Sequence, residues 1–151
     1  MMPVTRRALL PTLLAALALP ATTRLATASP TALDFDELYG AISVLGLEFS
    51  GKVKELDGKP VAMKGFMAPP LKAESNFFVL TEIPMSICPF CSSDADWPDN
   101  ILVVYLDARQ TFVQTNGVIR VSGILEVGSW TDPETGFVSR LRLRGASFAA
   151  A

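Results

Sequence analysis

The chain has 151 residues, with 13 lysines and arginines against 15 aspartates and glutamates, two cysteines and no histidine. This length has room for one domain, and the missing histidine excludes Ser–His and Cys–His nucleophile pairs, histidine-ligated zinc and c-type haem attachment. The net charge of −2 argues against a nucleic-acid partner, because phosphate binding depends on a basic surface.

Residues 1–28 have the pattern of a cleaved export signal. Arg6 and Arg7 precede an apolar run over residues 8–19, and the small residues 26–28 are typical of a cleavage site. The paired arginines resemble the twin-arginine export motif, and an ordinary secretory signal is the alternative. Both routes predict a periplasmic protein, and the apolar run is too short for a permanent membrane anchor. Removal of the signal takes away three arginines and no acid, which changes the net charge from −2 to −5.

Residues 29–48 form a lead segment that precedes the expected β domain. Leu38, Ile42 and Leu45 recur at helical spacing after three early acidic residues. The pattern predicts one short amphipathic helix over residues 33–44.

Residues 49–148 have the pattern of a β domain. The expected strands cover residues 48–55, 60–67, 76–83, 101–107, 118–127 and 138–144. Asp57 and Gly58 mark a hairpin turn between the first two strands. Glycine within several strands allows the sharp bending that closes a small barrel, as at Gly65, Gly123 and Gly145. The sequence therefore predicts an all-β fold, namely a five- to six-stranded OB-like barrel with one short N-terminal helix.

Three arginines alternate with leucines in the last expected strand, so that Arg140, Arg142 and Arg144 share one face. We expect this face to be a solvated edge that resists association between strands. A binding stripe for an anionic partner is the alternative.

Four segments of the mature chain carry a resemblance to a known family: LDGKPVAMKGFMAP at residues 56–69, FFVL at 77–80, VSG at 121–123 and TGF at 135–137. Together they resemble a family of exported bacterial proteins that contain a domain of unknown function. The resemblance implies an OB-like barrel, a periplasmic location, no established catalysis and an association with ABC transporter or metal-uptake components. Many relatives carry a single cysteine and a histidine in the central loop, whereas this chain has Cys-Pro-Phe-Cys there.

The two cysteines, Cys88 and Cys91, lie three positions apart in an expected loop between strands. Two thiolates at this spacing can bind a soft or borderline metal ion such as zinc or copper. Additional carboxylate ligands would favour zinc, and additional thioether ligands would favour copper. The alternative to metal binding is that the aspartates make turn hydrogen bonds and the methionines pack in the core. The candidate further ligands are Met85, Asp94 and Asp96, followed by Met63, Met67 and Asp99.

Two other uses of the cysteine pair stay open. In an oxidising compartment Cys88 and Cys91 can form a disulfide that holds the loop, or they can act in thiol–disulfide exchange with Cys88 as the attacking thiol. We therefore expect a non-catalytic periplasmic accessory or binding protein that serves a transport system, possessing a metal site at the cysteine pair. A thiol–disulfide exchange protein and a structural docking barrel with a Cys88–Cys91 disulfide are the alternatives.

Overall fold

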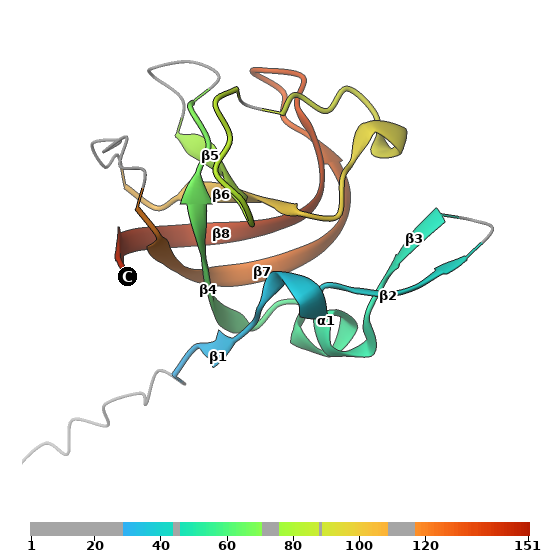
Figure 1. Cartoon of the computed structure of the whole chain (residues 1–151), viewed down its shortest axis with the longest axis horizontal. Helices are drawn as coiled ribbons and strands as arrows, with labels where there is room; N and C mark the ends of the chain where they lie inside the picture. The colour runs from blue at the N-terminus through green and yellow to red at the C-terminus, as the bar shows by residue number, and fades with distance from the viewer. Residues whose placement is uncertain (1–28, 44–45, 71–75, 88, 109–116) are drawn as a thin grey trace, which may run out of the picture.

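A computed structural model describes residues 29–43, 46–70, 76–87, 89–108 and 117–151 (Figure 1). The expected export signal and Cys88 both lie outside these described residues. Within them, no helix combines the length and the apolar character that crossing a bilayer requires.

Strands dominate the described residues, with one short α-helix and two 3-10 turns between them. In chain order the elements are β1 (Thr31–Ala32), η1 (Phe35–Glu37), β2 (Tyr39–Ser43), β3 (Gly46–Phe49), α1 (Gly51–Leu56), β4 (Pro60–Met67), β5 (Phe77–Thr81), η2 (Asp94–Asp96), β6 (Ile101–Leu106), β7 (Ile119–Thr131) and β8 (Val138–Ala150). The prediction of a mostly β protein is confirmed.

Six strands share one sheet in the order β1-β4-β5-β6-β8-β7, and β4 also pairs with β7. The first part of β4, Pro60–Gly65, is paired with β7, and its last two residues are paired with β5. The pairing of β6 with β8 is parallel, whereas β5 with β6 and β7 with β8 are antiparallel. Hydrogen bonding thus passes from β4 through β5, β6, β8 and β7 back to β4, and the long strands β7 and β8 curve strongly (Figure 1).

The core reaches both faces of β5 and β6, whose residues are all buried. Successive side chains of a strand point to opposite faces. On one face Phe77 packs against Tyr105 and Phe137, and on the other Phe78 packs against Phe148. The middle of the sheet is therefore covered on both sides.

The expected helix over residues 33–44 is wrong. Over residues 33–43, the part of this segment that the structure describes, the helical structure is limited to the 3-10 turn Phe35–Glu37, after which β2 pairs with β3 in a hairpin. Leu33 is fully buried and its backbone N–H donates to β4, while Tyr39 stacks on Phe49 with ring centroids 5.3 Å apart. These tertiary contacts outweigh the local helical spacing of the apolar residues.

A helix forms instead where residues 48–55 were expected to be a strand. Ser50 caps α1, since its Oγ accepts the N–H of Val53 at 3.2 Å and donates to a backbone carbonyl of η1 at 2.6 Å. Val53 and Leu56, three positions apart, are the buried residues of the helix. The cap and this spacing override the alternating pattern that suggested a strand.

The arginine strand is not an edge, because β8 lies between β6 and β7. The Nε of Arg142 donates to Glu126 at 2.8 Å, and the Arg142 side chain is almost fully buried. The guanidinium of Arg144 lies 4.2 Å from the ring centroids of both Tyr105 and Trp130. The expected solvated face is therefore an ordered layer of ion pairs and cation–π contacts.

Candidate functional site

The loop that carries the cysteines, residues 82–100 between β5 and β6, is anchored to the rest of the domain. We call it the cysteine loop. Its base is closed by a hydrogen bond from the N–H of Glu82 to the carbonyl of Asn100 at 3.0 Å. Trp97 is buried and its Nε1 donates to the Tyr39 hydroxyl at 2.7 Å. The loop is thus tied to β2 as well as to the sheet.

Cys91 is the buried anchor of this loop. Its carbonyl accepts the N–H of Val138 at the start of β8 at 2.9 Å, and its Sγ donates to the Asp96 carbonyl at 3.5 Å. Burial, with a smaller contribution from the negative charge of Asp96, raises the pKa of the Cys91 thiol to about 11. The thiol is therefore protonated at neutral pH in the metal-free protein, and a protonated thiol is a weak nucleophile.

The candidate carboxylates Asp94 and Asp96 accept hydrogen bonds from serines. The Oδ2 of Asp96 accepts from the hydroxyls of Ser93 and Ser92 at 2.9 and 3.0 Å, and these bonds lower the pKa of Asp96. The Oδ1 of Asp94 accepts from the hydroxyl of Ser129 on β7 at 2.7 Å. The two aspartates therefore make hydrogen bonds within the loop and to β7, which is the alternative to metal ligation.

The candidate methionines pack against the apolar core. Met63 and Met67 belong to the core cluster, and Met85 is half-buried against it. The described part of the chain holds no group of three or more cysteine, aspartate or glutamate side chains arranged to hold a metal ion. Because Cys88 lies outside the described residues, a site built on both cysteines stays a prediction.

Three large apolar side chains on the cysteine loop are exposed. Ile83, Ile87 and Phe90 have relative exposures of 55%, 80% and 50%. Phe90 packs edge-on against the buried ring of Phe137, with ring centroids 5.6 Å apart. We call Ile83, Ile87 and Phe90 the apolar tip. The two isoleucines were not identified from the sequence. Ile83 lay at the end of an expected strand, and only Ile87 stood in the loop rich in proline and serine, where an apolar residue is a visible signal.

A hollow of about 560 Å³ lies beside the loop, between η2 and β8. It is lined by Gly46, Leu47, Asp94, Ala95, Trp97 and Arg140. Arg140 donates to the Leu47 carbonyl at 3.1 Å, and its guanidinium lies 5.2 Å from the ring centroid of Phe49. Arg140 therefore joins the β2–β3 hairpin to β8.

The turn at residues 132–137 contacts the loop through the Phe137 ring and is organised by Asp132. Its Oδ1 accepts from the N–H groups of Glu134 and Thr135, and its Oδ2 accepts from the Tyr105 hydroxyl at 3.0 Å. Burial raises the pKa of Asp132, but these hydrogen bonds outweigh it, so the pKa is below the ordinary value of 3.8. Burial, followed by the charge of Asp132, raises the pKa of Tyr105.

The Asp132→Asn variant is expected to be about 1–3 kcal/mol less stable than the wild type at pH 7, because the amide nitrogen donates where the carboxylate accepts. A carboxyl group whose pKa is lower in the folded state stabilises the protein above its unfolded pKa, and this contribution disappears as the pH falls through the folded pKa. The difference should therefore shrink below about pH 3.8. Urea unfolding of both proteins between pH 7 and pH 2.5 measures it, and a constant difference over this range would contradict the assignment.

Comparisons with known proteins give a fold relative. No family model matches the chain, and no curated protein matches it. Among solved structures, the fold is similar to that of a DUF3299 family protein from Pseudomonas aeruginosa PAO1. The match covers 82% of this chain and 97% of that chain, with a TM-score of 0.56 and 14% sequence identity. At this identity the likeness shows a shared fold.

Proposed function

We propose that the protein is an exported, non-catalytic binding domain that contacts a protein partner in the cell envelope through the apolar tip of its cysteine loop. The observation that carries this proposal is the exposure of Ile83, Ile87 and Phe90 on a loop whose neighbours Cys91 and Trp97 are buried. Exposed apolar side chains that gather into one patch mark protein interaction sites, and three of them within eight residues of one anchored loop favour such a patch here. The partner that the family resemblance implies is a component of an envelope transport complex.

An OB-like barrel is the architecture that we propose for the domain. The cyclic pairing of β4, β5, β6, β8 and β7 supports it. OB-folds bind oligonucleotides on their second and third strands, which correspond here to β5 and β6. Both strands are buried along their whole length, which favours the loop over the barrel face as the binding surface.

We infer that Cys88 and Cys91 form a disulfide that holds the base of the apolar tip. A disulfide is uncharged, so it suits the buried position of Cys91. In the structure Cys91 is a free thiol whose Sγ donates to the Asp96 carbonyl, and oxidation would replace this weak hydrogen bond with the covalent link. An oxidising periplasm favours the same state. The export signal at residues 1–28 supports that location.

The cysteine state is tested by intact mass and metal content of the mature protein, purified from its native compartment with thiols trapped at harvest. We expect a mass two hydrogens lower than that of the dithiol, no bound metal and a mature N-terminus near Ser29. Two free thiols with one bound zinc or copper would overturn the disulfide in favour of a metal site. A disulfide that equilibrates with cellular thiol–disulfide couples would indicate exchange activity, which its reduction potential would measure.

The binding surface is tested by placing a photo-crosslinking residue at Ile87 in the native host. We expect crosslinks to one defined envelope protein, and their loss when Ile83 and Phe90 are both replaced by serine. The matched control is a crosslinker at Lys54, an exposed residue of α1, which should not give this product. Equal products at Ile87 and Lys54, or no product at Ile87, would contradict the proposed docking surface.

A further inference from the structure

Two cations face each other across the β4–β7 ladder. Lys64 on β4 lies directly opposite Arg120 on β7 in the antiparallel register, and both are exposed. Side chains of directly opposed residues are about 5 Å apart at Cβ, and like charges at such positions are destabilising. On the β7–β8 ladder the chain uses opposite charges, since Arg142 lies opposite Glu126. The Lys64–Arg120 pair is therefore an unfavourable arrangement unless something neutralises it.

No residue that the structure describes supplies this neutralising charge through an ion pair. The ion pairs within the described ranges join Lys52 to Glu37, and both Arg142 and Arg144 to Glu126. Neither Lys64 nor Arg120 takes part in them. The two positive charges are thus available to an anion from outside, on a domain whose net charge without the export signal is −5.

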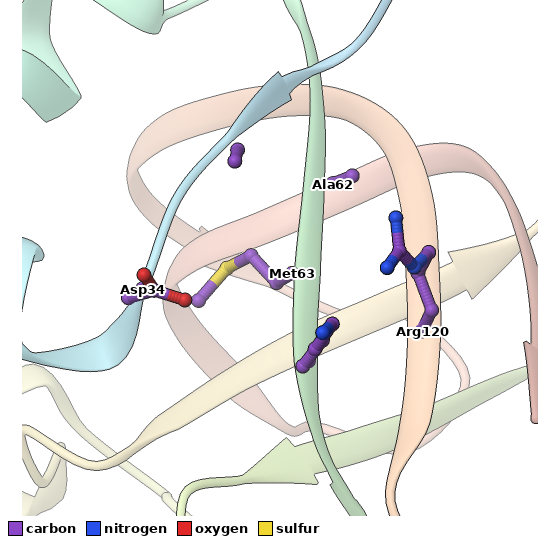
Figure 2. A pocket seen from close by; sticks show the side chains of 6 residues that line it. Asp34, Ala62, Met63 and Arg120 are labelled. Carbon is purple, nitrogen blue, oxygen red and sulfur yellow. The ribbon is translucent and has the colours of Figure 1, made fainter. Parts of the chain in front are cut away.

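A hollow of about 250 Å³ adjoins the pair. It is lined by Ala32, Asp34, Ala62, Met63, Lys64 and Arg120. Figure 2 shows Asp34 and Met63 on one side of β4 and Arg120 on the other. Two of the lining residues are alanines, which leave room beside the strand. The carboxylate of Asp34 repels an anion from its own side of the hollow, so that the favourable position is next to Lys64 and Arg120.

We propose that Lys64 and Arg120 bind a phosphate group in this hollow. Phosphate monoesters carry a charge between about −1.5 and −2 near pH 7, so two cations can balance one such group, whereas the phosphodiester of a phospholipid carries a charge of about −1. The planar guanidinium of arginine donates two parallel hydrogen bonds to phosphate oxygens, and the lysine ammonium adds a compact charge. The group is carried by a free small molecule or by a phospholipid, and the site is independent of the cysteine loop.

The site is tested by the effect of inorganic phosphate on thermal unfolding of the purified protein, at constant ionic strength adjusted with chloride. A ligand that binds only the folded state raises the melting temperature as its concentration passes the dissociation constant. We expect a saturable rise for the wild type and phosphate binding about tenfold weaker in Lys64→Gln and in Arg120→Gln. The matched control Lys54→Gln removes an exposed lysine of α1 and should respond like the wild type.

Two further measurements complete the test. The first shows that the variant is folded, and the second identifies the source of the phosphate group. Because the like charges repel, Lys64→Gln should be at least as stable as the wild type without phosphate, which shows that the variant is folded. Binding to phosphatidylglycerol vesicles that is lost in the double variant would identify a lipid headgroup, whereas a phosphate response without vesicle binding would identify a free small molecule. No phosphate response in the wild type, or an equal response in the double variant Lys64→Gln/Arg120→Gln, would overturn the proposal.

Discussion

The Phe137→Ala variant is expected to lose about 3–5 kcal/mol of unfolding free energy, because it leaves a cavity under the turn that supports the cysteine loop. Phe137 is fully buried, and its ring lies 5.8 Å from that of Phe77 on β5 and 5.6 Å from that of Phe90 on the loop. Its carbonyl also accepts the N–H of Asp132 at 2.8 Å. Chemical unfolding of the variant and the wild type measures the loss.

Phe90→Ala is the matched control for this change, since it removes the other ring of the same contact from a half-exposed position. We expect this variant to lose about 1 kcal/mol of unfolding free energy, because half of the Phe90 side chain is already exposed to water in the folded protein. Phe137→Ala should also speed hydrogen exchange at the amide of Val138, which bonds to the Cys91 carbonyl. Equal stability losses in the two variants would contradict the role of Phe137 as the core support of the loop.

The Gly65→Ala variant is expected to lose about 3 kcal/mol of unfolding free energy, at the upper end of typical overpacking costs. A Cβ at Gly65 would lie 2.7 Å from the backbone oxygen of Thr81 and 3.0 Å from the Cγ of Leu80. The backbone oxygen belongs to β5, which pairs with β4 immediately beyond Gly65, so it cannot move without breaking the sheet. Denaturant unfolding of the variant measures this cost.

Gly40→Ala on β2 is the control for Gly65→Ala, because a Cβ at Gly40 would meet no atom within 4 Å. The control should be within about 0.5 kcal/mol of the wild type or slightly more stable, since alanine reduces the entropy of the unfolded chain. A loss in Gly65→Ala no larger than in Gly40→Ala would show that β4 and β5 do not approach as closely as the structure places them.

The β character of residues 60–67 and 101–107 was predictable, because apolar and β-branched runs bounded by turn residues are typical of strands. Strands β4 and β6 lie at these positions. Residues 33–44 and 48–55 were predicted wrongly, because short segments have weak local preferences. The burial of Leu33 against the sheet and the Ser50 cap decided their structure.

The candidate site was predictable only in its location. The spacing of Cys88 and Cys91 marked the loop, and the expectation that they act together stays untested by the described residues. The sequence did not reveal that Cys91 is buried, or that serine hydroxyls donate hydrogen bonds to the carboxylates of Asp94 and Asp96. Spacing along a chain shows which groups are near one another, whereas burial and hydrogen bonding depend on segments that are distant in sequence.

By itself, the sequence determined the mostly β class of the protein, through period-two patterns and turn residues that act over a few positions. Only the tertiary structure decided which strands are neighbours. It placed the arginines of β8 between Glu126 and the aromatic rings instead of at an edge. It also set Lys64 opposite Arg120. The physical reason is that strand order and register are set by pairing and packing between residues far apart in the chain, which no local pattern encodes.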